Sequence, residues 1–162
     1  MFEEDDGDTV FEFLEEIDKI LLNESKIALS RPIYLSALVF PLLQKHLHNL
    51  HREKPMNLGE IQAESHFMIR DVFAPFLLIP KKITCAMVAI LTSQFRFTPL
   101  DPKPTRQRIP AIPDFHLAIQ FFELRSRIEP GLQSLYQEWN YFWRKHCERP
   151  PEHRRGRRRK RR

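Results

Sequence analysis

Apolar residues at helical spacing are the feature that most limits what this chain can fold into. From Ile33 to Leu50 they recur every three or four residues, and the same spacing returns in several other segments. Positions three and four apart lie on one face of an α-helix, so each segment predicts a helix with one face to bury. No segment shows the sustained alternation of a strand. A chain of 162 residues can enclose a core, so we predict an all-α array of about six helices.

Helix-start signals divide the periodic segments. Thr9 with Glu12, and Asn57 with Glu60, have the spacing of a capping box, in which two side chains satisfy backbone amides of the first turn. Pro41 lies inside the apolar stripe of the second helix, where we expect one helix with a bend. The predicted starts are Thr9, Ser30, Asn57, Pro80 and Asp114, and Pro130-Gly131 separates the fifth helix from the sixth.

A proline-rich connector joins the fourth predicted helix to the fifth. Five of the sixteen residues from Thr98 to Pro113 are proline, which excludes a helix or a central strand. Lys103, Arg106 and Arg108 lie in the same stretch. We therefore expect an extended surface segment with a basic side.

The last nine residues are almost entirely cationic. They read Arg-Arg-Gly-Arg-Arg-Arg-Lys-Arg-Arg, with no apolar side chain, so they cannot join a core. Without these eight charges the chain has more acidic than basic residues, which makes its basicity local. We expect a helical body, residues 1–148, and a disordered Arg-rich tail, residues 149–162. Neutralising nucleic-acid phosphates with release of counterions is the tail's favoured role, and a solubility tail or cloning remnant is the alternative.

Cysteine use and hydropathy predict a cytoplasmic protein with no membrane span. Cys85 and Cys147 are far apart and form no Cys-x-x-Cys pair, which fits a reducing compartment. The longest apolar run, near Ile33–Leu43, covers about half of a ~20-residue membrane span. The acidic start, Met-Phe-Glu-Glu-Asp-Asp, is unlike the basic start of a signal peptide.

No convincing catalytic or metal-binding constellation occurs in the sequence. His46, His48 and His51 have the wrong spacing for three zinc ligands on one helix face, and a polar helix face explains them better. Asp6-Gly7-Asp8 has the form of a carboxylate pair for Mg²⁺, but an acidic run that stabilises the start of the first helix is the stronger interpretation. We predict no catalytic residue and no metal site in this chain.

Two other sets of residues are candidates for contact with nucleic acid. Lys81 and Lys82 follow Pro80 at a predicted helix start, where backbone amides and two ammonium groups can hold a phosphate, although ordinary surface lysines have the same pattern. The last helix carries aromatic residues that can stack on bases, but their spacing favours a buried stripe. Trp143, which precedes Arg144-Lys145, is the one we expect to be exposed if any is. These aromatic residues are Tyr136, Trp139, Phe142 and Trp143.

Five landmarks, in order, resemble the bacterial poly(A) polymerase I family, within the class II tRNA nucleotidyltransferases and poly(A) polymerases. Pro32–Leu43 resembles a body-domain helix of that family, and Leu78–Thr84 resembles its Ile-Pro-Lys/Arg-Arg/Lys segment. Pro113–Arg125 resembles its Pro-x-Phe stretch that ends in Leu-Arg. The helix of Trp139–Trp143 and the basic tail follow in the same order, so the resemblance covers nearly the whole chain.

The resemblance implies the RNA-binding C-terminal region of a poly(A) polymerase. In that family a catalytic head with Mg²⁺-binding carboxylates and an ATP-selecting neck lies N-terminal to this region, and its motifs are absent here. We expect Mg²⁺ and ATP only with that head, so the isolated chain should be inactive. A split-gene product, a truncated gene model and an excised fragment all stay open. The resemblance assigns RNA contact to Lys81, Lys82, Arg125, Arg154, Arg155, Arg157, Arg158, Arg159, Lys160, Arg161 and Arg162.

Three hypotheses for function follow. In the first, the chain holds an RNA 3′ end for ATP-dependent polyadenylation by a separate catalytic head, with RNA and that head as its partners. In the second, it is a helical protein-interaction module whose basic tail is a targeting address or a membrane-surface anchor. The third, an autonomous enzyme, needs a carboxylate or histidine constellation that the sequence lacks.

Overall fold

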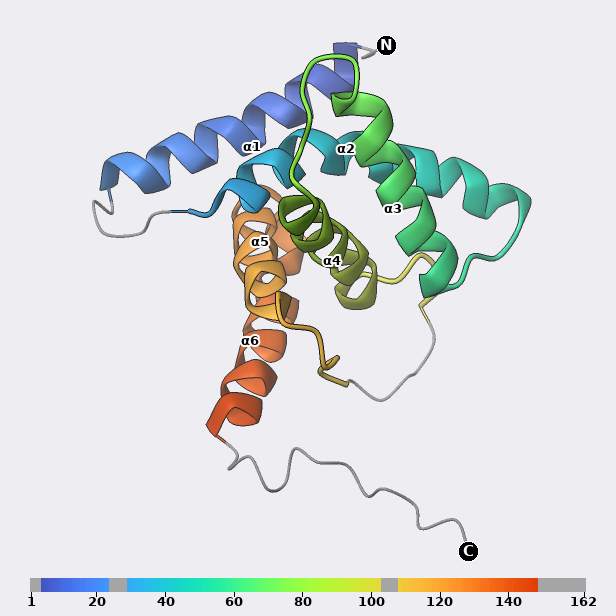
Figure 1. The fold of residues 1–162 in the computed structure, drawn as a ribbon. Helices are drawn as coiled ribbons and strands as arrows, with labels where there is room; N and C mark the ends of the chain where they lie inside the picture. The colour runs from blue at the N-terminus through green and yellow to red at the C-terminus, as the bar shows by residue number, and fades with distance from the viewer. Residues whose placement is uncertain (1–3, 24–28, 103–107, 149–162) are drawn as a thin grey trace, which may run out of the picture.

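The computed structural model describes residues 4–23, 29–102 and 108–148, without the side chains of residues 4–6 and 23. These residues form only helices and connecting segments, which confirms the predicted all-α class (Figure 1). The 3₁₀ turn Pro130–Leu132 lies directly before the last helix. The six α-helices are α1 (Glu4–Asn23), α2 (Arg31–Glu53), α3 (Leu58–Phe73), α4 (Lys81–Phe97), α5 (Phe115–Ile128) and α6 (Gln133–Glu148).

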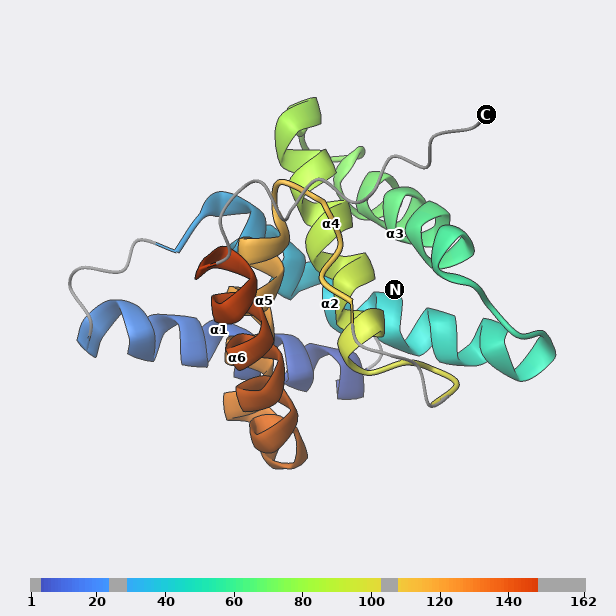
Figure 2. The same ribbon diagram turned by 90° about the horizontal axis from the view of Figure 1, so that it is seen from below.

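α4 lies at the centre of the array. It packs against α2, α3 and α5, and its apolar residues Met87, Ile90 and Leu91 are fully enclosed. α1 crosses the other side of α2 and α5, and α6 packs mainly on α5 (Figures 1 and 2). Helices on several sides of α4 therefore bury the apolar stripe that the sequence predicts for it.

Two apolar clusters hold the helices together. The larger one draws on α1 to α5, and its aromatic centre joins Phe13, Phe40 and Phe121. The Phe13 and Phe121 rings stack with centroids 5.6 Å apart, and Phe40 meets Phe121 edge-on at 5.5 Å. The smaller cluster fixes α6, because it includes Trp139 together with Phe97, Phe115 and Phe122, and the Trp139 ring meets Phe97 edge-on at a centroid distance of 4.9 Å.

Most predicted helix boundaries are confirmed. The Asn57–Glu60 capping box is complete: the Glu60 N–H donates to Asn57 Oδ1 at 3.0 Å, and the Asn57 N–H donates to Glu60 Oε2 at 2.9 Å. Ser30, Pro80 and Asp114 occupy the positions just before α2, α4 and α5, although no cap hydrogen bond from their side chains is found. α2 continues through Pro41 as one helix, as predicted.

The predicted start of the first helix at Thr9 is wrong. α1 begins at Glu4, so Thr9 lies inside the helix and cannot cap it. Acidic residues are favourable in the first turn of a helix, because the backbone amides there carry partial positive charge. The acidic run that precedes Thr9 is therefore part of α1. Gly7, within that run, has no neighbouring atom within 4 Å of an added Cβ, so no close approach requires glycine there.

Within the part of the chain that the structure describes, no helix is both long enough and apolar enough to cross a membrane.

Candidate nucleic-acid interface

Lys81 and Lys82 are exposed at the first two positions of α4. The Pro80 carbonyl accepts the N–H groups of Ile83 and Thr84 at 2.9 and 3.0 Å, which closes the first turn. Within the described residues no side chain caps this turn, and the turn contains no acidic residue. Two ammonium groups beside an uncapped helix start can bind one backbone phosphate without reading base sequence.

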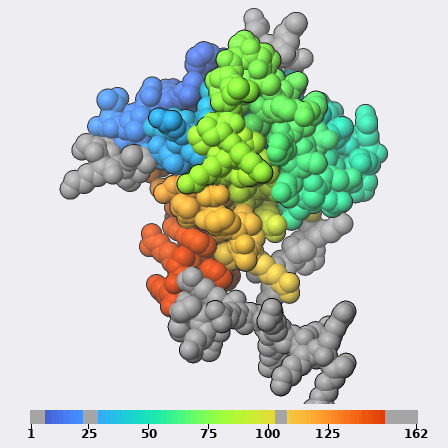
Figure 3. Space-filling view, viewed as in Figure 1, coloured from blue at the N-terminus to red at the C-terminus, as the bar shows by residue number. Residues whose placement is uncertain are grey.

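An apolar surface lies directly before these lysines. Phe76 is 85% exposed and Leu78 is 94% exposed in the segment between α3 and α4, which stands at the top of the space-filling view (Figure 3). Beside it a hollow of about 600 Å³ is lined mainly by apolar side chains. Large contiguous apolar patches on a protein surface are common at contact sites for other molecules. The hollow is lined by Leu42, Met68, Asp71, Val72, Phe73, Phe76 and Leu77.

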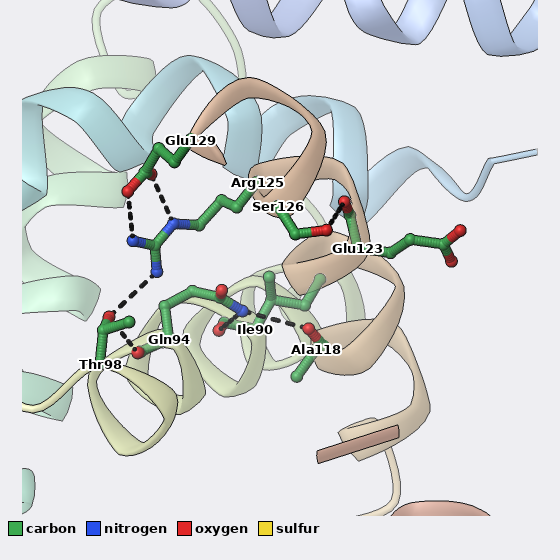
Figure 4. Close-up of polar contacts among 8 residues, drawn as sticks. All are labelled: Ile90, Gln94, Thr98, Ala118, Glu123, Arg125, Ser126 and Glu129. Carbon is green, nitrogen blue, oxygen red and sulfur yellow. Dashed lines mark hydrogen bonds and ion pairs between the residues drawn. The ribbon is translucent and has the colours of Figure 1, made fainter. Parts of the chain in front are cut away.

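Arg125 is buried, with 1% of its surface exposed. Its Nε and Nη2 donate to the two carboxylate oxygens of Glu129 at 2.9 and 3.2 Å, and its Nη1 donates to Thr98 Oγ1 at 3.1 Å (Figure 4). Its Cζ lies 4.6 Å from the centroid of the Phe40 ring. A guanidinium so enclosed has no surface to offer a phosphate, so we leave Arg125 out of the candidate interface and assign it a structural role.

Gln94 has a similar structural role that the sequence analysis missed. Its side chain is fully buried, and its Nε2 donates to the Ile90 and Ala118 carbonyls at 3.2 and 3.1 Å (Figure 4). The second bond ties α4 to α5. The only signal in the sequence is an amide residue within an otherwise apolar stripe, and this pattern does not reveal the partner on another helix.

The aromatic residues of α6 fall into two groups. Trp139 is buried, and Trp143 is half-buried with its ring edge-on to Phe115 at a centroid distance of 5.3 Å. Tyr141 and Phe142 are 55% and 41% exposed. The buried-stripe prediction is therefore confirmed for Trp139, but it is wrong for Phe142.

Phe142, not Trp143, is the exposed member of the predicted stripe. Trp139 and Trp143 are four residues apart and share the face of α6 that packs on α5, whereas Phe142 lies at the edge of that face. Tyr141, which lies on the outer face, was not in the predicted set. Lys145 Nζ lies 4.5 Å from the centroid of the Tyr141 ring, and Arg144 is exposed beside it.

Tyr136 belongs to the packed side of α6. Asn140 Nδ2 donates to its hydroxyl at 3.2 Å, and its ring meets Phe122 edge-on. Burial raises the pKa of Tyr136 to about 12, and the nearby Glu123 carboxylate adds to the rise. The hydroxyl therefore remains protonated throughout the neutral range.

The weaker sequence candidates do not assemble into a site. His46 Nε2 contacts Glu64 Oε2 at 2.9 Å, and His48 Nδ1 contacts the Gln44 carbonyl at 2.7 Å, so the two histidines have different partners. Asp8 is exposed in the first turns of α1. Within the described ranges, no three His, Cys, Asp or Glu side chains are grouped for a metal ion.

Of the residues predicted to contact RNA, the structure describes Lys81, Lys82 and Arg125, and of these three the two lysines are exposed. Lys81 and Lys82 stand at the start of α4, whereas α6 projects below α5, away from α3 (Figure 1). The eight cations from Arg154 to Arg162 lie outside the described residues, as do Lys103 and Arg106. Their predicted contacts with RNA stay predictions.

A family model described as polymerase A arginine-rich C-terminus matches residues 62–162, which run from α3 to the end of the basic tail. This is well over half of the chain. No curated protein and no solved structure matches it.

Proposed function

This chain belongs to the family of polymerase A arginine-rich C-termini, and we propose that it binds RNA for a poly(A) polymerase and presents the 3′ end to a catalytic head. The match to the family supports the assignment to a C-terminal region of a poly(A) polymerase. RNA binding and cooperation with a head are the further steps of the proposal.

The distribution of charge is the observation that carries the proposal. Eight of the last nine residues are cationic, whereas the rest of the chain has more acidic than basic residues. A cationic segment of this density attracts the phosphate backbone through counterion release and does not need a particular sequence. That property suits a protein that must hold the 3′ ends of many different RNAs.

Lys81 and Lys82 form the second part of the proposed interface. They are exposed, they follow one another at an uncapped helix start, and they lie within the family match. A phosphate bound there would contact the ordered body of the protein, whereas the tail would add affinity without fixing the position of the RNA.

Catalysis belongs, under this proposal, to a separate head. Because the described residues hold no cluster suited to a metal ion, we derive no step through Mg²⁺ and assign both Mg²⁺ and ATP to the head. The isolated chain should bind RNA and incorporate no AMP. We also propose a cytoplasmic location, which the wide separation of Cys85 and Cys147 in the sequence supports, because two such cysteines do not make a disulfide framework.

Binding to a fluorescent oligo(A) strand over a range of salt concentrations tests the proposal. For single strands the logarithm of affinity falls with the logarithm of salt by about 0.7 per phosphate contact, so eight tail cations account for a slope of at most about −6. Deleting residues 154–162 should flatten the slope by several units. The double substitution Lys81→Ala/Lys82→Ala should flatten it by about 1.

Two exposed arginines at the ends of α2 provide the matched control for the lysine pair. Arg31→Ala/Arg52→Ala removes the same charge from a surface outside the proposed interface, and it should change the slope less. A slope that the tail deletion leaves unchanged would remove the tail from the RNA-binding role.

The exposed apolar surface at Phe76 and Leu78 supports a second candidate function, docking of a protein partner. In that case a complex recovered with this chain should survive nuclease treatment and be lost in Leu78→Asp, and the chain should bind no oligo(A) even at low salt. Loss of the complex on nuclease treatment favours the RNA-binding function.

A further inference from the structure

We propose that the exposed surface of α6, from Tyr141 on the outer face to Phe142 at the edge of the packed face, is a stacking platform for unpaired RNA bases, with Arg144 and Lys145 beside the two rings. This inference rests on the proposed RNA-binding function and adds to it a specific surface with a different kind of contact. α6 projects from the body at the lower end of the molecule (Figures 1 and 3).

The packing of α6 leaves these two rings without a role in the core. Trp139 is the one fully buried residue of the helix, and half-buried Trp143 completes the contact with α5 through Phe115. Tyr141 and Phe142 are 55% and 41% exposed, and neither belongs to the apolar cluster that holds α6 on α5. Two neighbouring aromatic rings on an exposed helix surface leave apolar area in contact with water, and a ligand that covers them would remove that area from water.

The charges around the rings favour stacking over simple electrostatic attraction. Lys145 Nζ lies 4.5 Å from the centroid of the Tyr141 ring, where an ammonium can also meet a phosphate next to a stacked base. The whole helix has two carboxylates, Glu138 and Glu148, against two permanent cations, Arg144 and Lys145. α6 therefore has no excess positive charge, and the rings must supply its part of the affinity.

The position of α6 in the chain identifies single-stranded RNA as the occupant. The first tail cation, Arg154, comes six residues after the last residue of α6, a distance that an extended chain spans in about 20 Å. A strand whose phosphates bind the tail is therefore within reach of the rings. Because every base has a π-face, stacking there tolerates any sequence, as binding of varied 3′ ends requires.

Comparison of two probes separates stacking from charge. One probe is a single-stranded oligo(A), and the other is an abasic ribose-phosphate oligomer of the same length and charge. Tyr141→Ala/Phe142→Ala should weaken binding of oligo(A) by at least about fivefold to 150-fold, the range for losing one stacked base, and should leave binding of the abasic oligomer unchanged. The salt slope should not change, since no cation is removed.

Three further variants serve as controls. Tyr141→Leu/Phe142→Leu keeps apolar side chains and good helix formers on the same surface, so it should fold and lose the preference for oligo(A) equally. Tyr141→Trp/Phe142→Trp should keep that preference. Phe11→Ala, which removes a ring that is 70% exposed on α1, should bind both probes as the unmodified chain does.

The outcomes distinguish failure of the inference from failure of the proposed function. If the unmodified chain binds oligo(A) and the abasic oligomer equally, or if the alanine and leucine variants retain full affinity for oligo(A), the platform does not exist and RNA binding by the tail still stands. Equal weakening for both probes shows contact with the backbone and overturns stacking. If the unmodified chain binds neither probe at low salt, the proposed function itself fails.

Discussion

α4 and α6 have nearly the same length, 17 and 16 residues, but opposite relations to the fold. α4 buries ten residues among α2, α3 and α5, whereas α6 buries one and packs mainly on α5. Both have apolar residues at helical spacing. The comparison shows that a periodic pattern predicts a helix with a packing face, but the number of neighbouring helices decides which apolar residues remain free to bind a ligand.

The largest expected difference between the two helices is in stability. Ile90→Ala in α4 removes a fully enclosed side chain and should lower the free energy of unfolding by about 2–5 kcal/mol. Tyr141→Ala in α6 removes a mostly exposed ring and should change it by at most about 0.5 kcal/mol. Urea denaturation followed by circular dichroism measures both. Similar losses in the two variants would contradict the contrast drawn here.

Arg125 provides a second, smaller test, because it ties the end of α4 to α5. Arg125→Met keeps an apolar stem against Phe40 but removes the bonds to Glu129 and Thr98, so the free energy of unfolding should fall by about 2 kcal/mol. The affinity of the folded variant for oligo(A) should not change. Arg125→Lys should also be less stable than the unmodified chain, because one ammonium group cannot reproduce the paired bonds to Glu129.

RNA affinity decides whether that structural assignment is right. Lys81→Ala, the matched substitution of an exposed cation, should weaken RNA binding and leave stability unchanged. If folded Arg125→Met lost RNA affinity as Lys81→Ala does, Arg125 would be a contact residue, as the resemblance implied.

The smallest effect concerns the packed side of α6 at high pH. Burial and Glu123 raise the pKa of Tyr136 to about 12, whereas the unfolded chain ionises this group near its ordinary value of about 10. Between these values the folded state binds more protons, so the free energy of unfolding falls as pH rises. Tyr136→Phe has no hydroxyl to ionise, so its free energy of unfolding should fall less between pH 9 and pH 11. Urea denaturation of both proteins at pH 9, 10 and 11 measures the difference. An identical pH dependence in both proteins would contradict it.

Local signals in the sequence predicted the helices well. Asn57 and Glu60 are three residues apart and cap each other, so no information from another element is needed to place the start of α3. Pro80 likewise precedes α4 through its own backbone restriction. The predicted start at Thr9 is wrong because the residue types that cap a helix also occur inside one. The acidic residues before Thr9 already favour a helix start.

The candidate interface was less accessible from sequence, because exposure depends on distant residues. Arg125 ends a motif that the resemblance linked to RNA, but its partners Thr98 and Phe40 come from other parts of the chain. Phe142 and Trp143 are adjacent in sequence and both fit the predicted stripe, and only the position of α5 covers Trp143 more than Phe142. No local pattern contains that information.

The separate cluster around Trp139 has a consequence for the dynamics of the molecule. The larger cluster of α1 to α5 does not include Trp139, so we expect that α6 can detach while Phe13, Phe40 and Phe121 remain packed. Such a partial opening requires less free energy than global unfolding, and the amide hydrogens of α6 should exchange with solvent sooner than those of α4. A ligand that bridges α6 and the tail would slow this exchange, linking occupancy of the site to the order of the helix that forms it.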